Sequence, residues 1–286
     1  ARARAGREFR CDTREKGRRM SKYTSIFGAD IIDAHAFIGN WPFRRLRRND
    51  TAGLLAMMDQ FGIAKSCVAS AEAILYRDAH DGNKKLYDDT RAHTDRFLLY
   101  ATLNPAYAGW QRDLKECVDL GFKALRLHPI YHGYTLESAE CLAIIDAVTE
   151  AGLAVSFQCR VEDLRQRHWM DVLDNLEPER VLALAEQRPK ATIILLESIL
   201  SWPRESDHWK RMHALPFYVE CSRMTSVLGK DIETMLGALG PDRVLLGTGF
   251  PFKTPSPAFL KLQCLNADED AKSAIAGGNA RRLFAP

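Results

Sequence analysis

The sequence lacks several features that identify common protein classes. No apolar run approaches the roughly 18–20 residues of a membrane-spanning helix, so we expect no membrane partner. The seven cysteines form no Cys-x-x-Cys pair and are odd in number, which favours a reduced, cytoplasmic protein over a disulfide-bonded secreted one. No Gly-x-Gly-x-x-Gly phosphate loop follows an apolar run, which argues against a doubly wound dinucleotide-binding sheet.

A net positive charge is absent outside the first residues. The formal net charge of the 286 residues is +3, but residues 1–19 hold seven Arg and one Lys against three acids, a local charge of +5. Subtracting it leaves about −2 for the remaining 267 residues, so we expect no nucleic-acid partner. We predict a basic, disordered tail over residues 1–24, with a basic arm or a transit peptide as the alternative, and one domain over residues 25–286.

The sequence does have a regular alternation of two patterns. Short apolar runs rich in β-branched and aromatic residues recur at intervals of roughly 25–40 residues, and they occupy residues 31–39, 65–71, 97–105, 122–129, 153–160, 192–198, 217–223 and 243–251. Amphipathic segments such as 137–153 and 231–241 lie between them, and several contain glycine near their ends, as helices often do. Eight repeats of strand and helix, with nearly continuous apolar strands, predict a single (β/α)8 TIM barrel.

Polar residues stand where the apolar runs end. They are His35, Glu72, Asn104, Arg126, His128, Gln158, Arg160, Glu197, Glu220, Arg223 and Thr248. The carboxyl ends of barrel strands form the active-site face, and polar side chains there are costly to bury unless they serve one another or a ligand. We therefore expect the active site at this end, although any one of these residues is equally well explained as a rim residue in contact with water.

Five segments carry a family pattern: IIDAHAFIGNWPFR (31–44), GFKALRLHPIYHGY (121–134), VEDLRQRH (161–168), DRVLLGTGFPF (242–252) and the closing AIAGGNARRLF (274–284). Together they resemble the amidohydrolase-related family of the amidohydrolase 2 type, from about Ile31 to Phe284. The resemblance implies a (β/α)8 barrel, commonly one divalent metal, usually zinc, and hydrolysis or decarboxylation of small carboxylated molecules.

The metal ligands that the resemblance implies are mostly replaced. The family's first strand ends Asp-x-His-x-His; His35 matches the first histidine, and Phe37 stands in place of the second. Gln158 occupies the position of the usual fifth-strand histidine, and Gly249 replaces the aspartate of the eighth-strand Gly-Thr-Asp-Phe-Pro. Because zinc needs about three or four ligands, we predict a degraded metal site without a bound metal, and we assign no metal ligand.

Other side chains could rebuild a site. Glu197 or Ser198 stands on the sixth strand, where a family histidine often assists, and Glu220, Cys221 and His128 are also of suitable type. Glu220 and Cys221 are adjacent on one strand, so one of them must leave the barrel interior. A divalent metal such as zinc, held by unconventional ligands, is therefore the alternative.

Without a metal, acid–base and anion-binding side chains must carry the chemistry. We predict catalytic roles for His35, His128 and Glu197, because histidine exchanges protons near neutral pH and an acid beside it can fix its tautomer. Arginine and tyrosine can hold a carboxylate or an oxyanion; the predicted substrate-binding residues are Arg44, Arg126, His132, Tyr134, Gln158, Arg160 and His168. A solvated basic face is the alternative for Arg44, and surface loop positions are the alternative for His132 and His168.

Three functions are compatible with these residues. The main prediction is a hydrolase of the amidohydrolase superfamily that acts on a small-molecule substrate, a carboxylated one, with little or no metal dependence. The pyrone dicarboxylate lactonases are a metal-independent branch of the family, but they keep the eighth-strand aspartate that this chain lacks. The alternatives are a metal-dependent hydrolase or decarboxylase with unconventional ligands, and a non-catalytic barrel that binds a small molecule or a partner protein. Substrate identity and homo-oligomer formation stay open.

Overall fold

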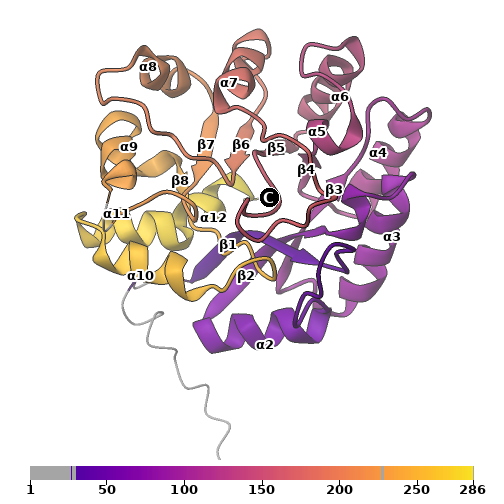
Figure 1. The fold of residues 1–286 in the computed structure, drawn as a ribbon, viewed down its shortest axis with the longest axis horizontal. Helices are drawn as coiled ribbons and strands as arrows, with labels where there is room; N and C mark the ends of the chain where they lie inside the picture. The colour runs from indigo at the N-terminus through magenta and orange to yellow at the C-terminus, as the bar shows by residue number, and fades with distance from the viewer. Residues whose placement is uncertain (1–26, 28–29, 227–228, 286) are drawn as a thin grey trace, which may run out of the picture.

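The strands close into one barrel. The computed structural model describes residues 27, 30–226 and 229–285 (Figure 1). Eight strands pair in parallel and in chain order; they are β1 Ile31–Ile38, β2 Ile63–Ser70, β3 Phe97–Thr102, β4 Ala124–Leu127, β5 Ala154–Gln158, β6 Ile193–Leu196, β7 Phe217–Glu220 and β8 Val244–Leu245. The amide of Ala34 donates to the carbonyl of Leu246 at 2.8 Å, and Ala36 pairs with Phe250. The single (β/α)8 TIM barrel predicted from the sequence is confirmed.

Helices surround the strands (Figure 1). The α-helices are α2 Thr51–Phe61, α3 Ala79–Thr90, α4 Trp110–Asp119, α5 Pro129–His132, α6 Ala139–Glu150, α7 Pro178–Gln187, α8 Asp207–His213, α9 Asp231–Leu239, α10 Ser256–Cys264, α11 Glu269–Ser273 and α12 Asn279–Leu283. The described residues also form four short helical segments. Three are 3-10 helices, η1 Glu72–Ile74, η2 Arg91–His93 and η3 Pro241–Arg243, and one is a π-helix, η4 Ala274–Gly278. Local signals set the helix ends: Asp50 caps α2 by accepting from the Gly53 amide at 2.7 Å, and Gly62 ends it at φ 71°.

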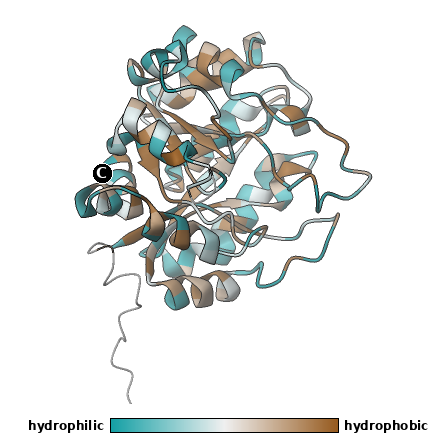
Figure 2. Cartoon of the chain, turned by 60° about the vertical axis from the view of Figure 1, so that its left-hand side comes forward, coloured by the Kyte–Doolittle hydropathy of each residue, from teal (hydrophilic) through white to brown (hydrophobic). Residues whose placement is uncertain are grey.

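The core has an inner and an outer part. Alternate strand side chains point inward and outward, so that Val155 and Phe157 pack in the cluster that includes the helices, whereas Ala154 belongs to a second buried cluster with Tyr100 and Ile194. Figure 2 shows hydrophobic residues concentrated in the strands and hydrophilic residues on the outer faces of the helices. The interior is therefore packed with side chains, and a site can form at the carboxyl ends of the strands.

Several other predictions from the sequence can be compared with the structure. The predicted tail over residues 1–24 lies outside the described residues. The six cysteines that the structure describes are free thiols. Across 27, 30–226 and 229–285, no helix has the length and apolar character needed to cross a membrane. Each predicted run overlaps a strand, and β2 begins two residues before its run, at Ile63. β8 is the short segment Val244–Leu245, because beyond it the chain turns over the barrel end, with Gly249 at φ 65°.

Candidate active site at the carboxyl end of the barrel

Three strands bring His35, Glu197 and Glu220 together. His35 lies on β1, Glu197 follows β6 directly, and Glu220 ends β7. The Nδ1 atom of His35 is 3.5 Å from Glu197 Oε1 and 3.7 Å from Glu220 Oε2, and all three side chains are buried. At these separations the contacts are electrostatic and not hydrogen bonds. Neither ring nitrogen of His35 has a hydrogen-bond partner among the described residues. We call this group the His35–Glu197–Glu220 cluster.

Backbone geometry aims the two carboxylates. Glu197 has φ 56°, a left-handed conformation that is uncommon for residues other than glycine. Glu220 accepts from the backbone amide of Ser222, and the Ser222 hydroxyl lies 3.0 Å from Glu220 Oε2 and 3.3 Å from Glu197 Oε1. A Cβ atom at Gly247 would lie 2.5 Å from Glu220 Cγ. Glycine at position 247 therefore leaves the space that the Glu220 side chain occupies.

Lys253 is the charged partner of the cluster. Its Nζ atom lies 2.5 Å from each carboxylate oxygen of Glu197, and the lysine side chain is 29% exposed, compared with 2% for Glu197. A Cβ atom at Gly249 would lie 3.1 Å from Glu197 Oε1 and 3.1 Å from Lys253 Cδ. The position at which the family carries an aspartate is thus occupied partly by a lysine side chain from four residues further along.

Burial and neighbouring groups act in different directions on the pKa values of His35 and Glu220. Burial lowers the pKa of His35, and the charge of Arg126 acts in the same direction, so the imidazole is neutral near pH 7. Burial alone would raise the pKa of Glu220, but its contact with His35, the charge of Lys253 and the Ser222 amide outweigh burial and bring that pKa below its usual value. The cluster is a neutral imidazole between two carboxylates, one of which has an ammonium group against it.

Asp33 connects β1 to the chain after β8. Its Oδ1 atom accepts from the amides of His35 at 3.0 Å and Thr248 at 2.9 Å, and its Oδ2 atom accepts from the Thr248 hydroxyl at 2.7 Å. Burial raises the pKa of Asp33 to about 7 in spite of these hydrogen bonds. Asp33 therefore holds the backbone of His35 in place, and it closes the barrel at the level of the cluster.

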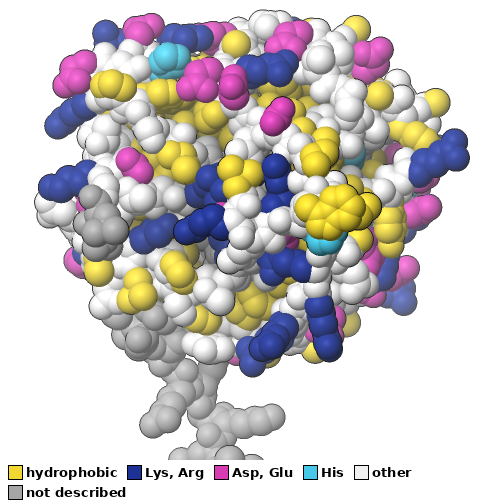
Figure 3. Space-filling view, viewed as in Figure 1, with side chains coloured by type: hydrophobic (Ala, Val, Ile, Leu, Met, Phe, Trp, Pro, Cys, Tyr) yellow, Lys and Arg dark blue, Asp and Glu magenta, His cyan; other side chains and the backbone are white. Residues whose placement is uncertain are grey.

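A basic cavity of about 1130 Å³ opens above the cluster. Nine arginine and lysine side chains and two acidic ones line this cavity, which we call the larger cavity. Figure 3 shows Lys and Arg gathered near the middle of the same face. The basic residues are Arg44, Arg45, Arg47, Arg48, Arg160, Arg165, Arg223, Lys253 and Lys261. Lys253 and Ser222 line the cavity and contact Glu197, so they stand between the cavity and the buried cluster.

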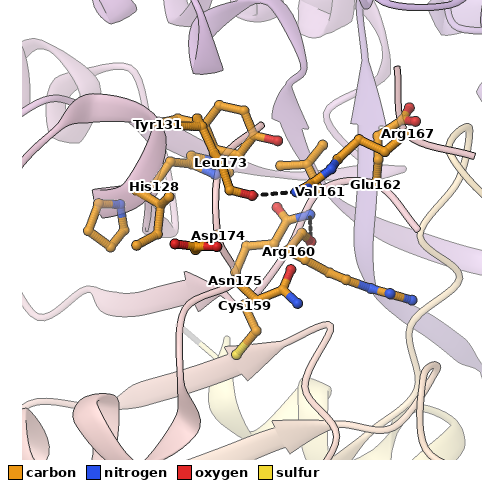
Figure 4. Close-up of a pocket in the computed structure, with 13 residues that line it drawn as sticks. His128, Tyr131, Cys159, Arg160, Val161, Glu162, Arg167, Leu173, Asp174 and Asn175 are labelled. Carbon is orange, nitrogen blue, oxygen red and sulfur yellow. Dashed lines mark hydrogen bonds between the residues drawn. The ribbon is translucent and has the colours of Figure 1, made fainter. Parts of the chain in front are cut away.

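A smaller cavity of about 10 Å³, room for one water molecule, lies beside it (Figure 4). His128, Gln158 and Arg160 line it, and Gln158 Nε2 donates to the carbonyl of Arg160 at 2.9 Å. Burial lowers the pKa of His128 well below its usual value, which keeps the imidazole neutral. Within the described part of the chain, His128 Nε2, Gln158 Oε1 and Arg160 Nε have no hydrogen-bond partner.

Among the predicted substrate-binding residues, Arg44, Gln158 and Arg160 line these cavities. Arg44 Nε donates to Glu162 Oε1 at 2.7 Å, and its second nitrogen donates to the carbonyl of Phe252 at 2.9 Å. Arg160 donates to Asp163 Oδ2 at 3.2 Å. Both arginines are therefore fixed at the cavity wall by protein partners, with their charge toward the basic space.

The other predicted binding residues lie away from these two cavities. Arg126 is fully buried, with its guanidinium carbon 4.7 Å from the Phe37 ring centre and 5.0 Å from that of Tyr100. His168 stacks on Phe43 with ring centres 5.8 Å apart. His132 and Tyr134 pack beside each other behind His128. A substrate-binding role for these four, Arg126, His132, Tyr134 and His168, stays a prediction.

Phe37, which stands in place of the second family histidine, packs against His35. Its ring packs edge-on against His35, with centres 5.4 Å apart, and against Phe252 at 5.2 Å. Trp41 also packs edge-on against Phe252, with ring centres 5.3 Å apart. The aromatic group thus supports the His35 ring by packing where the family places a ligand.

The cluster nevertheless fits a divalent ion. Two ligand atoms bound to one tetrahedral ion at about 2.1 Å stand about 3.4 Å apart, close to the 3.5 Å and 3.7 Å measured from His35. The ligand atoms of His35, Glu197 and Glu220 all lie within 4.8 Å of one another. His35 matches the family pattern, and the chain after β6 and the end of β7 bring in Glu197 and Glu220, two of the side chains considered as substitute ligands. This geometry favours the metal-dependent alternative over the main prediction.

Sequence reasoning missed Lys253 and Ser222, and it weighed Glu220 without assigning it a role. The segment Gly249–Lys253, GFPFK, held the relevant signal: a glycine stands where the resemblance implies a carboxylate, and a lysine follows four residues later. Glu220 was harder to predict as a site residue, because its neighbour Cys221 also carries a possible ligand atom and the sequence does not show which of the two points into the barrel.

Comparison with known proteins identifies the family of the chain. The amidohydrolase family profile matches residues 32–285, which is almost the whole barrel. The chain belongs to the amidohydrolase family. No curated protein matches it by sequence.

Solved structures of family-like barrels are similar over most of their length. A 2,6-dihydroxybenzoate decarboxylase in complex with 2,6-dihydroxybenzoate is 18% identical, with a TM-score of 0.66, over 90% of this chain and 98% of that one. The 5-carboxyvanillate decarboxylase of Sphingomonas paucimobilis is 17% identical, with a TM-score of 0.68, over 90% and 99%. A dihydroxybenzoic acid decarboxylase of Polaromonas sp. JS666, with bound manganese and the inhibitor 2-nitroresorcinol, is 17% identical, with a TM-score of 0.67, over 90% and 97%. At these identities the similarity establishes the fold alone.

Proposed function

We propose that this member of the amidohydrolase family is a metal-dependent decarboxylase of a small aromatic carboxylic acid. The observation that carries the proposal is the buried His35–Glu197–Glu220 cluster, in which an imidazole with no hydrogen-bond partner among the described residues faces two carboxylates beneath a basic cavity. Solved barrels of the same fold that are decarboxylases, one of them with bound manganese, support this choice of reaction over hydrolysis.

The three cluster residues would hold the ion through one imidazole nitrogen and two carboxylates. A bound divalent ion would supply Lewis-acid polarisation of a substrate oxygen. Arg160 and Arg44 would pair with the substrate's negative charge by charge-assisted hydrogen bonds, and Phe252, which lines the larger cavity, offers an apolar face to an aromatic ring.

The reaction requires one proton. The bond between the ring carbon and the carboxylate breaks, its electron pair stays on the ring carbon, that carbon takes a proton, and carbon dioxide leaves. His128 is our candidate for this transfer, because a neutral imidazole can take a proton at one nitrogen as it releases one from the other. His128 lines the small cavity, and its Nε2 atom has no hydrogen-bond partner among the described residues.

Lys253 favours a second candidate, the metal-independent hydrolase. Its ammonium group already neutralises Glu197 at 2.5 Å, so the cluster can exist without an ion. In that case His35, between two carboxylates, would act as a general base toward water, and the basic cavity would bind a carboxylated ester, lactone or amide.

Chelator-treated protein reloaded with an excess of Mn²⁺ separates the two candidates. We expect carbon dioxide release from 2,6-dihydroxybenzoate or a related hydroxybenzoate in the reloaded protein, and at least about a hundredfold loss in Glu220→Gln, since a metal ligand is removed. Glu186→Gln, a surface change in the ion pair with Arg211, is the matched control and should keep full activity. Hydrolysis by chelated protein, with no decarboxylation after reloading with Mn²⁺ or Zn²⁺, would replace this proposal with the hydrolase.

A further inference from the structure

Lys253 contacts the same carboxylate oxygens of Glu197 that would hold a metal ion. An ion bound to Glu197 uses the lone pairs of its carboxylate oxygens, and the ammonium group of Lys253 lies 2.5 Å from both of them. The ammonium group and a divalent cation on the same carboxylate would repel each other strongly in a buried site. The two cations are therefore alternatives at Glu197.

Lys253 also covers the cluster. The side chains of His35, Glu197 and Glu220 are at most 2% exposed, whereas Lys253 lines the larger cavity and is partly exposed. The cavity is large enough for the lysine side chain to swing into it, since its volume is about 1130 Å³. An ion that approaches from the cavity must displace Lys253 before it reaches Glu197.

Gly249 makes this arrangement sterically feasible. Any larger residue would place a Cβ atom 3.1 Å from Lys253 Cδ and from Glu197 Oε1, and the positive φ of 65° already favours glycine. Position 249 is thus shaped to admit the lysine stem between the chain after β8 and the Glu197 carboxylate.

We propose that Lys253 is a resident cation that competes with the divalent metal for Glu197 and sets the metal concentration at which the site fills. The inference rests on the proposed function, because it presupposes a metal at the cluster. It adds that the metal-free state is a closed state, in which Lys253 neutralises the charge of Glu197, and that metal binding requires the Lys253–Glu197 contact to open.

Calorimetric titration of the full chain with Mn²⁺ tests the competition. Lys253→Met removes the ammonium group, and Lys253→Gln removes the charge but keeps a polar end. The titration needs only one of these two variants to fold. Lys261→Met is the matched control: Lys261 lines the same cavity, but it donates to the carbonyl of Ser222 and not to a cluster carboxylate. We expect the Lys253 variants to bind Mn²⁺ about tenfold or more tighter than wild type, and Lys261→Met to stay within about threefold.

The possible results distinguish this inference from the proposed function. Equal Mn²⁺ affinity in wild type and both Lys253 variants overturns the competition and leaves the metal site intact. An equal gain in the Lys253 and Lys261 variants also overturns it, because a general field of positive charge would then be the cause. Absence of Mn²⁺ binding in all four proteins overturns both the competition and the metal-dependent function.

Discussion

At the scale of single residues, the site combines losses and replacements. Phe37 and Gly249 remove two family ligands, and Glu197, Glu220 and Lys253 provide two carboxylates and a cation at the same place. The replacements are coupled by charge: two buried carboxylates need a compensating cation, and either an ammonium group or a metal ion can supply it. The chemistry of the site therefore depends on which cation is present.

Arg160 tests the anion-binding role of the cavity. Its guanidinium is buried, lines both cavities and has an unpaired Nε within the described structure, so Arg160→Met should weaken the binding of 2,6-dihydroxybenzoate by about 2–5 kcal/mol, the usual loss for a desolvated charge pair. Isothermal titration measures the effect. Arg165→Met is the control, because Arg165 shares the partner Asp163 but is 87% exposed; it should change affinity by less than about 1 kcal/mol.

An equal loss in the two arginine variants would contradict a specific role for Arg160. It would mean that the carboxylate responds to the summed charge of the cavity and is not held by one guanidinium. A loss confined to Arg160→Met, by contrast, would place the substrate carboxylate at the wall shared by the two cavities.

The residue types of the site were predictable, but their partners were not. His35, Glu197 and Glu220 were all recognisable as polar residues at the ends of apolar strands. Which of them meet depends on barrel closure, since these residues come from β1, β6 and β7 and are separated by more than twenty positions in the chain. Arg126 shows the opposite case: it has the same pattern as Arg160, yet its side chain is packed between the rings of Phe37 and Tyr100.

At the scale of the elements, the regular recurrence of apolar runs in the sequence was sufficient to predict the fold. Continuous apolar runs bounded by turns specify buried parallel strands, and all eight are present. The ends of the strands were less predictable, because the polar segments after them leave the ladder to form the site. The run 243–251 illustrates this: its regular strand is Val244–Leu245, and Thr248 onward serves the closure of the barrel.

The Asp33–Thr248 contact should contribute measurably to this closure. Thr248→Val keeps the shape of the side chain but removes the hydroxyl that donates to Asp33 at 2.7 Å, so it should lower the free energy of unfolding by about 1–3 kcal/mol, the cost of an unsatisfied buried polar group. Urea denaturation followed by circular dichroism measures it. Thr102→Val is the matched control, a buried β3 threonine whose hydroxyl has no partner in the described structure; we expect it to be neutral or slightly stabilising. Equal losses in both variants would show that the contact adds nothing specific.

At the scale of the whole molecule, the charge distribution matters more than the total. Outside residues 1–19 the chain carries about −2, yet the larger cavity is lined by nine basic and two acidic residues. A concave basic surface on an otherwise weakly acidic body concentrates small anions at its mouth and raises their association rates. The same positive field disfavours the approach of a metal cation. A metal site beneath this cavity therefore needs the negative charge of two carboxylates, Glu197 and Glu220, and not only neutral ligands.

Metal binding should therefore be visible in the stability of the whole protein. A ligand that binds the folded chain alone adds about 2.7 kcal/mol of stability at a hundred times its dissociation constant, and 1 kcal/mol shifts Tm by about 2–4 °C in a domain of roughly this size. We expect saturating Mn²⁺ to raise Tm by about 5–10 °C in differential scanning calorimetry, and Glu220→Gln to abolish the increase. Glu162→Gln is the control, since Glu162 is equally buried at the cavity but pairs with Arg44 outside the cluster. An increase of the same size in Glu220→Gln would place the ion elsewhere on the protein and remove the cluster as its site.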